Sequence, residues 1–307
     1  MIKKTLRKKL YILLFALAIF SICAVACTAG GTPSGNYQTH SSEIYLDRGD
    51  STYSFAEAVY PLGINQDMPL VVIAHGFSGT LNSGGAEELA HKLAAVGIAS
   101  VRVDFNPRIS PEKNSERTFT YNLKSMEKDM LLAIDYMLSH FEIDQDRIGL
   151  YGRSMGGRVA MIMANESSGL HDYKALALVA PAGNETAMID YMGGQSRWEE
   201  MKQEALTKGY VECKGLKLTS SWFEFFEEYN PCVHGDNFTD KPVLVICNTL
   251  DNVVTEATSK ECASAYKNSQ VIEVTTDNYH GYEMGYKESE LKDYLMTEIT
   301  DFFISSL

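Results

Sequence analysis

The chain lacks the cysteine and histidine patterns that bind metal ions. Its six cysteines and seven histidines include no C-x-x-C pair and no histidine cluster, so we predict no metal site and no cofactor. Internal repeats and long low-complexity tracts are also missing. The 307 residues are 45% hydrophobic and 22% charged, which is typical of a globular protein. One α/β domain can span this length, so two domains are not required.

Positive charge is concentrated at the N-terminus, where residues 3–9 are mostly lysine and arginine and residues 10–26 are uncharged and mostly apolar. This pattern predicts a secretory signal over residues 1–26. Small residues stand directly before Cys27, as in bacterial lipoprotein signals. We therefore predict cleavage there and a lipid on Cys27 that anchors the protein to the extracytoplasmic face of the cell membrane. Cys23 fits less well, because Ile22 occupies a position that needs a small residue.

The alternative is an uncleaved N-terminal helix, since the apolar segment is close to the length that spans a bilayer. Both interpretations predict an exported protein attached to a membrane. Without residues 1–26 the chain keeps 22 Lys+Arg against 40 Asp+Glu, a net charge of −18. A protein this acidic is a poor partner for nucleic acid or anionic lipid, so we predict no nucleic-acid partner. Residues 27–42 are mostly small or polar and predict a tether.

A G-x-S-x-G motif, Gly152-Arg153-Ser154-Met155-Gly156, follows the apolar run at residues 147–151 and precedes a helix-like segment at 158–165. This context is typical of a serine nucleophile on a sharp turn from strand to helix. The two glycines allow strand and helix backbones to approach, and the start of the helix adds partial positive charge near a developing oxyanion. We therefore predict that Ser154 is a nucleophile.

The order of residues along the chain predicts the base and the acid, because enzymes with this motif have Ser, then Asp or Glu, then His. His280 follows the strand-like residues 270–274, whereas His234 precedes the strand that should carry the acid. Asp251 follows the buried strand predicted at residues 243–247, and one helix and one strand fit between it and His280. Asp277 is the rival acid, but three residues before His280 it is expected to shape the turn.

The loop after an earlier strand predicts an oxyanion hole. A buried strand at residues 69–74 is followed by His75-Gly76-Phe77-Ser78-Gly79. Two backbone N–H groups can hold the negative charge that develops on a carbonyl oxygen. We assign one to Met155, directly after the nucleophile, and the other to Phe77. His75 is expected to brace the loop rather than to move protons.

Together these residues resemble the α/β-hydrolase superfamily, and within it the branch of cinnamoyl and feruloyl esterases, acylglycerol lipases and serine-aminopeptidase-like hydrolases. The resemblance covers about residues 44–307 and rests on segments 71–79, 99–106, 152–157 and 178–182 and on the loops of Asp251 and His280. The chain departs from it at residues 106–110, Asn-Pro-Arg-Ile-Ser, where relatives often have Gly-His-Gly-x-Ser. The resemblance therefore does not fix the substrate.

Strand-like runs alternate with helical patterns, which predicts a doubly wound, mostly parallel sheet over residues 43–307, the α/β-hydrolase fold. The runs are 71–75, 99–104, 147–151, 175–180, 243–247 and 270–274, with an edge hairpin over 44–60 and the best helix over 121–141. The insertion at about 182–240 is longer than an ordinary crossover, and the resemblance implies a cap that covers the nucleophile. Its aromatic residues suit an apolar or aromatic acyl group, or they hold a small cap together.

Two cysteines in this insertion, Cys213 and Cys232, are candidates for a disulfide outside the cytoplasm, although sequence does not fix their geometry. Cys247 lies in a predicted strand and is expected to be a buried thiol.

The motifs and the resemblance predict a serine carboxylic-ester hydrolase whose partner is a small-molecule ester, of cinnamoyl, feruloyl or short acyl type. The alternative is an exported serine peptidase that acts on short peptides. Its carboxylates for a substrate amine would be Glu199, Glu200 and Glu204, which equally fit the solvated face of a helix. A third interpretation is a lipoprotein that binds a ligand without catalysis. The sequence does not determine the oligomeric state.

Overall fold

The computed structural model of the protein describes residues 36–108, 122–166, 171–238 and 240–307, with the side chains of 106–108 left undescribed. The predicted N-terminal signal, most of the tether and residues 109–110 of the segment 106–110 therefore lie outside the described residues. Among the residues that are described, no helix is both long and apolar enough to cross a membrane.

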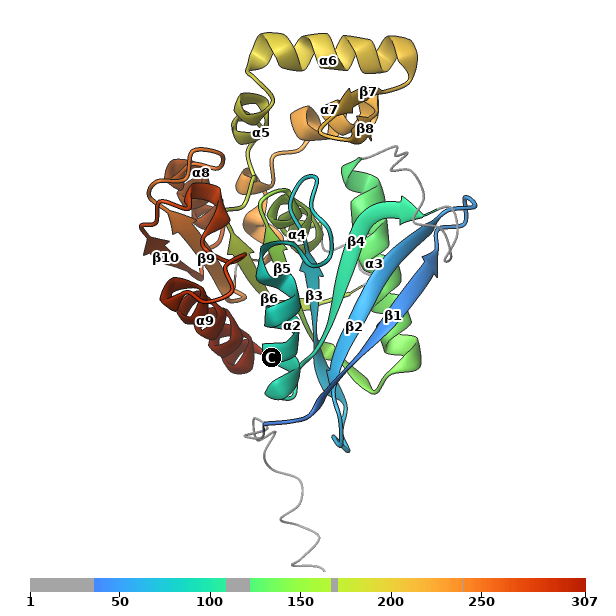
Figure 1. The fold of residues 1–307 in the computed structure, drawn as a ribbon, viewed down its shortest axis with the longest axis vertical. Helices are drawn as coiled ribbons and strands as arrows, with labels where there is room; N and C mark the ends of the chain where they lie inside the picture. The colour runs from blue at the N-terminus through green and yellow to red at the C-terminus, as the bar shows by residue number, and fades with distance from the viewer. Residues whose placement is uncertain (1–35, 109–121, 167–170, 239) are drawn as a thin grey trace, which may run out of the picture. The chain divides into compact units, whose positions relative to one another are not determined.

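An eight-stranded sheet forms the centre of the fold, in the order β1-β2-β4-β3-β5-β6-β9-β10 (Figure 1). Strands from β4 to β10 pair in parallel, and β1 and β2 form an antiparallel hairpin at one edge. The predicted doubly wound, mostly parallel sheet with its edge hairpin is confirmed. The strands are β1 Thr39–Asp47, β2 Tyr53–Pro61, β3 Met68–Ala74, β4 Ala99–Arg108, β5 Ile143–Arg153, β6 Tyr173–Val179, β9 Val243–Asn248 and β10 Ser269–Val274.

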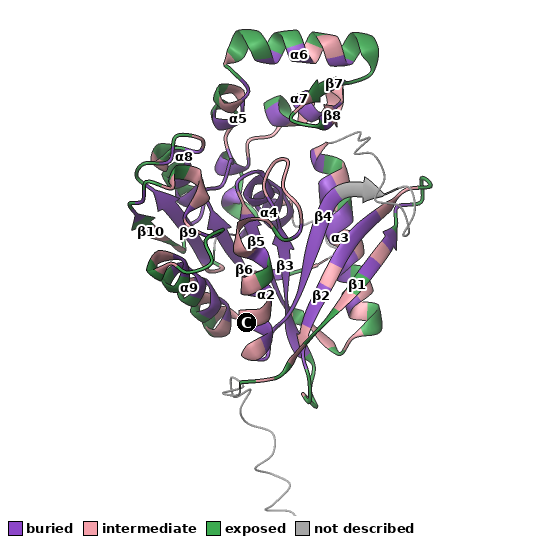
Figure 2. Ribbon diagram, in the orientation of Figure 1, coloured by how far each residue is buried: buried purple, intermediate pink, exposed green. Residues whose placement is uncertain are grey.

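Helices cover both faces of this sheet. Helices α3 Leu123–His140, α4 Met155–Asn165 and α8 Glu256–Ser264 contribute to one apolar cluster, whereas α2 Ala86–Ala95 and α9 Glu290–Ser306 contribute to the other. Strands β3 and β9 are buried along their whole length, because helices exclude water from both sides (Figure 2). This explains why their sequences read as continuous apolar runs without alternation.

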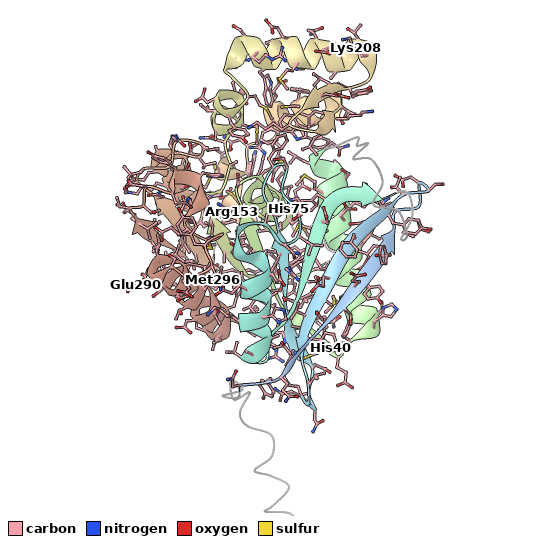
Figure 3. The ribbon with its side chains drawn as sticks, viewed as in Figure 1. His40, His75, Arg153, Lys208, Glu290 and Met296 are labelled. Carbon is pink, nitrogen blue, oxygen red and sulfur yellow. The ribbon has the colours of Figure 1, made fainter. Side chains whose placement is uncertain are left out.

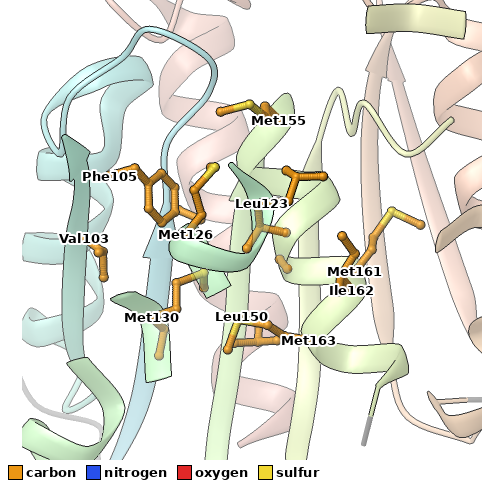
Figure 4. Close-up of a cluster of buried hydrophobic side chains, with 14 of the residues drawn as sticks. Val103, Phe105, Leu123, Met126, Met130, Leu150, Met155, Met161, Ile162 and Met163 are labelled. Carbon is orange, nitrogen blue, oxygen red and sulfur yellow. The ribbon is translucent and has the colours of Figure 1, made fainter. Parts of the chain in front are cut away.

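Helix α3 matches the strongest helical pattern of the sequence. Met126, Met130, Ile134 and Met137 are fully buried along one side, as the spacing predicts. The helix begins later than expected because the Asn122 side chain accepts a hydrogen bond from the Ser125 N–H and caps it. Figure 4 shows Met126 of α3 beside Phe105 of β4, in the buried cluster that also contains Val103, Met130 and Met155.

The predicted insertion at 182–240 contains elements of its own, which Figure 1 shows beyond the carboxyl ends of the parallel strands. They are α5 Glu185–Tyr191, α6 Gln195–Lys208, β7 Val211–Cys213, β8 Leu216–Leu218, α7 Ser220–Glu228 and the short helices η2 Pro231–Val233 and η3 Gly235–Phe238. We call residues 182–240 the cap. Its own core is aromatic, since Trp198, Trp222, Phe223 and Phe226 are fully buried with ring centroids 4.8–5.9 Å apart. These four of its nine aromatic residues therefore hold the cap together.

Candidate active site

Ser154 lies at the turn between β5 and α4 in a strained backbone conformation, φ 55° and ψ −120°. Its N–H donates to the Val179 carbonyl at 2.9 Å, and its carbonyl accepts from the Ala182 N–H at 3.0 Å. These bonds to the end of β6 and to the start of the cap hold the turn from the neighbouring strand. The conformation presents the side chain at the carboxyl edge of the sheet.

The two glycines of the motif are required by contact. A Cβ at Gly152 would lie 2.4 Å from the Gly156 carbonyl oxygen, and a Cβ at Gly156 would lie 2.4 Å from that of Ala74. Both distances are far below any real contact, and backbone atoms cannot move aside cheaply. The predicted steric reason for these glycines is therefore confirmed, because β5, α4 and β3 approach one another here.

The structure brings Ser154, His280 and Asp251 together from three separate parts of the chain. His280 Nε2 is 3.0 Å from Ser154 Oγ, and His280 Nδ1 is 2.8 Å from Asp251 Oδ2. A carboxylate only accepts, so the Nδ1 atom carries the proton and Nε2 offers its lone pair to the serine hydroxyl. The arrangement can accept the serine proton and hold the resulting imidazolium.

Asp251 is buried and takes hydrogen bonds on both oxygens. Its Oδ1 accepts from the N–H groups of Val253 and Val254 at 2.8 and 3.0 Å, and its Oδ2 accepts from His280 and from the Tyr282 hydroxyl at 3.2 Å. These four donors offset the cost of burying the carboxylate and fix its orientation. The rival Asp277 is exposed on the loop before His280. His234 stacks on Tyr229 in the returning part of the cap.

Two residues that sequence reasoning missed tie the acid loop to the base loop. The buried Tyr282 hydroxyl accepts from the Asn248 N–H at 2.8 Å and donates to Asp251, and burial, with Asp251 adding to it, raises the pKa of this phenol far above its usual value. The Asn248 side chain donates to the carbonyls of Thr276 and Tyr279 at 2.9 and 2.7 Å. The only signal in the sequence was that Tyr282 stands two residues after His280, and this does not predict its hydrogen bonds.

Arg153, the residue before the nucleophile, was also missed as a site residue. Its guanidinium donates to the His280 carbonyl, and it packs so closely on Gly84 that a Cβ there would lie 2.4 Å from Arg153 Nη1. The strand that presents the serine therefore also holds the loop that presents the histidine. Figure 3 shows Arg153 and His75 close to the ends of their strands, beneath the cap.

The loop at residues 75–79 lies directly against Ser154, since a Cβ at Gly76 would lie 3.2 Å from Ser154 Cβ. The buried His75 ring accepts from the Phe105 N–H at Nε2, so its Nδ1 donates to the Gly76 carbonyl at 2.7 Å. The Gly76 carbonyl and the Phe77 N–H belong to one planar peptide and point in opposite directions. His75 thus braces the loop, as predicted, and fixes the direction of the Phe77 N–H.

Met155 is the first residue of α4, and its side chain is fully buried in the cluster of Figure 4. The N–H groups of a helix's first turn have no acceptor within the helix, so the Met155 amide is available to an oxyanion by position. Above the loop, the Phe77 ring meets the cap through Trp222 and Tyr191, with centroids 5.8 and 6.3 Å apart. The cap therefore contacts the predicted oxyanion loop directly.

The other predicted candidates are placed elsewhere. Glu199, Glu200 and Glu204 pair with Gln195, Arg197 and Lys208 along the exposed side of α6, which agrees with the solvated-face interpretation (Figure 2). Cys247 is buried in β9, as expected. Cys213 and Cys232, the two candidates for a disulfide, do not meet in the structure, because Cys213 contacts Met192 and Cys232 contacts Cys262. Within the described part of the chain, no group of three or more His, Cys, Asp or Glu is placed to hold a metal ion.

A family model described as an alpha/beta hydrolase domain matches residues 67–182, from β3 to the start of the cap. No curated protein sequence matches the chain. Among solved structures, Est1E from Butyrivibrio proteoclasticus with bound ferulic acid is 20% identical, with a TM-score of 0.67 over 86% of this chain and 98% of that chain.

Two further solved structures have the same fold. The esterase domain of a Rhodothermus marinus protein is 14% identical, with a TM-score of 0.59 over 87% of this chain and 98% of that chain. Dienelactone hydrolase from Anabaena variabilis is 15% identical, with a TM-score of 0.55 over 88% of this chain and 100% of that chain. At these identities the likeness establishes the fold alone.

Proposed function

We propose that this chain, which has the α/β-hydrolase fold, is a serine hydrolase that cleaves carboxylic esters. The observation that carries the proposal is the hydrogen-bonded chain from Ser154 through His280 to Asp251, with distances of 3.0 and 2.8 Å. Covalent acyl transfer needs a nucleophile, a base that takes its proton and an acid that orients the base. Ser154, His280 and Asp251 are placed to supply these three groups.

In the proposed mechanism Ser154 Oγ attacks the ester carbonyl while His280 Nε2 takes its proton. The negative charge on the carbonyl oxygen is held by the N–H groups of Phe77 and Met155. His280 then protonates the leaving alcohol, and an acyl group remains on Ser154. A water molecule, deprotonated by His280, releases the acid and restores the serine. Asp251 keeps the imidazole oriented throughout and stabilises its charged form.

For the substrate, we propose an ester with an aromatic or short acyl group, of the cinnamoyl or feruloyl kind. Two observations favour this class. Phe77, Tyr191 and Trp222 form an aromatic group directly above the predicted oxyanion loop. The similar structure Est1E holds ferulic acid. The peptidase alternative is less favoured, because its candidate carboxylates lie on α6 in pairs with neighbouring side chains.

A fluorophosphonate probe tests the nucleophile. We expect the full-length protein to be labelled and Ser154→Ala to lose both the label and nearly all ester hydrolysis while it still folds. Ser196→Ala, an exposed serine on α6, is the matched control and should label like the wild type. Full labelling of Ser154→Ala would refute the assignment.

Methyl ferulate, p-nitrophenyl acetate and aminoacyl amides, assayed in parallel, then identify the substrate class. Turnover of methyl ferulate and the acetate with little turnover of amides is the expected result. The opposite order, with amides cleaved fastest, would favour the exported peptidase. A protein that takes no label and cleaves none of these compounds would fit the ligand-binding interpretation.

A further inference from the structure

Cys232 and Cys262 lie in contact beneath the cap, and neither takes part in the proposed reaction. Their Sγ atoms are 2.6 Å apart, although 30 positions separate them in the chain. Non-bonded carbon atoms rest about 3.5–4.0 Å apart, and sulfur is larger. Both side chains are buried, with 4% and 0% of their surface exposed. The two sulfur atoms are therefore much closer than two separate thiols would rest.

Three segments of the chain meet at this pair. Cys232 belongs to η2, where the cap returns to the sheet, and Cys262 belongs to α8. Gly183 belongs to the outgoing end of the cap, and a Cβ there would lie 2.4 Å from the Cys262 sulfur and 2.5 Å from the Cys232 sulfur. The Cys262 thiol also lies 3.7 Å from the Pro181 carbonyl. The two cysteines thus lie where both ends of the cap meet helix α8.

We propose that Cys232 and Cys262 form a disulfide in the mature protein, which joins the returning end of the cap to α8. The oxidant is a disulfide-bearing compound such as oxidised glutathione. One cysteine thiolate attacks that disulfide, forms a mixed disulfide and releases one thiol. The other cysteine thiolate then attacks the mixed disulfide and releases the second thiol. The protein loses two electrons and two protons, and the oxidant is reduced to two thiols.

The bond forms while the chain folds and is protected afterwards. The hydrogen bond between the two thiols and their burial raise the pKa of the Cys232 thiol, and both cysteines are buried once the cap is closed. Exchange with an oxidant therefore needs the open chain, and exchange with a reductant is slow once the cap is closed. An exported protein meets such oxidants as it folds.

The two remaining cysteines of the described chain do not compete for the bond. Cys213 Sγ faces Met192 Sδ at 3.5 Å inside the cap, and Cys247 lies fully buried in β9. The geometry therefore selects one pair. The proposal does not depend on Ser154 being a nucleophile, so its test and the fluorophosphonate test can fail separately.

Peptide mapping of the full-length chain tests the bond. The protein is expressed with its own N-terminal segment in a bacterial host, purified in detergent without reductant, and alkylated under denaturing conditions. Trypsin and Asp-N together place Cys213, Cys232, Cys247 and Cys262 on separate peptides, 209–214, 218–235, 240–250 and 261–267. We expect 218–235 linked to 261–267, and the linked mass should vanish on reduction. Four alkylated thiols, or 218–235 linked to 209–214, would overturn the proposal.

Thermal unfolding gives a second readout. Closing a loop of this length stabilises a protein, so wild-type protein that is reduced with dithiothreitol while unfolded and then refolded should have a Tm lower by roughly 5–10 °C. Cys232→Ser and Cys262→Ser should start from the lower Tm and not respond to dithiothreitol. Cys213→Ser is the control and should respond like the wild type. Equal responses from all four proteins would contradict the bond, and the peptide map decides the question if a serine variant fails to fold.

Discussion

Asp251 and Asp277 both precede His280 in the chain and are the two candidates for the acid, yet their surroundings differ. Asp251 is buried, accepts four hydrogen bonds and touches the imidazole at 2.8 Å. Asp277 is exposed at the start of the turn. A buried carboxylate with fixed donors can orient an imidazole, whereas an exposed one moves with solvent. Burial and contact therefore favour Asp251 over Asp277 as the proposed acid.

Exchanging each aspartate for asparagine distinguishes their roles. Asp251→Asn should lower kcat by about 10³–10⁴-fold, because the amide no longer fixes the tautomer that leaves Nε2 free. Asp277→Asn should leave kcat nearly unchanged and is the matched control. Steady-state hydrolysis of p-nitrophenyl acetate measures both. If Asp277→Asn were the more damaging change, the acid would be misassigned.

Among the elements, α4 does more than present Ser154, because Arg158 in its second turn fastens both ends of the cap. The guanidinium donates to the Gly183 carbonyl at the start of the cap and to the Phe226 and Tyr229 carbonyls at its end, and it lies 4.2 Å from the Phe226 ring centroid. The side chain is fully buried, and burial lowers its pKa to about 10, so it stays charged at neutral pH. Arg158 thus joins helix α4 to the cap through buried hydrogen bonds.

Removing this guanidinium should loosen the cap. Arg158→Met leaves several buried carbonyls without a donor, and we expect a loss of about 3–5 kcal/mol in the free energy of unfolding. Arg158→Lys should restore only part of it, because an ammonium cannot span both ends of the cap as the planar guanidinium does. Arg197→Met, on the exposed side of α6, should change stability by about 0.5 kcal/mol or less. Urea unfolding followed by tryptophan fluorescence measures all three, and an unchanged Arg158→Met would contradict the fastening.

Helix α5 ends at Tyr191, a cap residue that packs against the core and that we propose contacts the acyl group of the substrate. Tyr191 is partly exposed and meets the Phe77 ring edge-on. Tyr191→Ala should raise KM for methyl ferulate several-fold and leave p-nitrophenyl acetate nearly unaffected, because a small acyl group needs little binding surface. Tyr210→Ala, an exposed cap tyrosine that packs under Lys217, is the control. Equal losses on both esters would mean that Tyr191 supports the cap and does not choose the substrate.

For the whole molecule, we propose that the protein is exported and held to the membrane by a lipid on Cys27. Cys27→Ser should prevent incorporation of a labelled fatty acid and release the protein from the membrane fraction. A single lipid-bearing residue, rather than a spanning helix, then carries the attachment. Cys23→Ser is the control and should be labelled like the wild type. Membrane retention of Cys27→Ser without any label would instead favour the uncleaved N-terminal helix.

The sequence by itself determined the fold class, because its information is local and periodic. Buried strands read as apolar runs, α3 reads as a stripe of methionine, leucine and isoleucine, and the strand–turn–helix context of Ser154 is written in consecutive residues. The order of Ser154, Asp251 and His280 pointed to three loops that the structure brings together, since the topology of the sheet fixes which strand ends meet.

Only the tertiary structure decided the contacts between residues far apart in the chain. Tyr282 lies outside the motifs and Arg153 occupies a variable position of G-x-S-x-G, so their hydrogen bonds to Asp251 and to the His280 carbonyl could not be read from the sequence. Cys213 and Cys232 were candidates for a disulfide because they share one insertion, but the fold places Cys262 of α8 beside Cys232 instead. Distance along the chain does not measure distance in space once a cap folds back over a sheet, so the partners of buried polar and sulfur atoms were settled by three-dimensional packing.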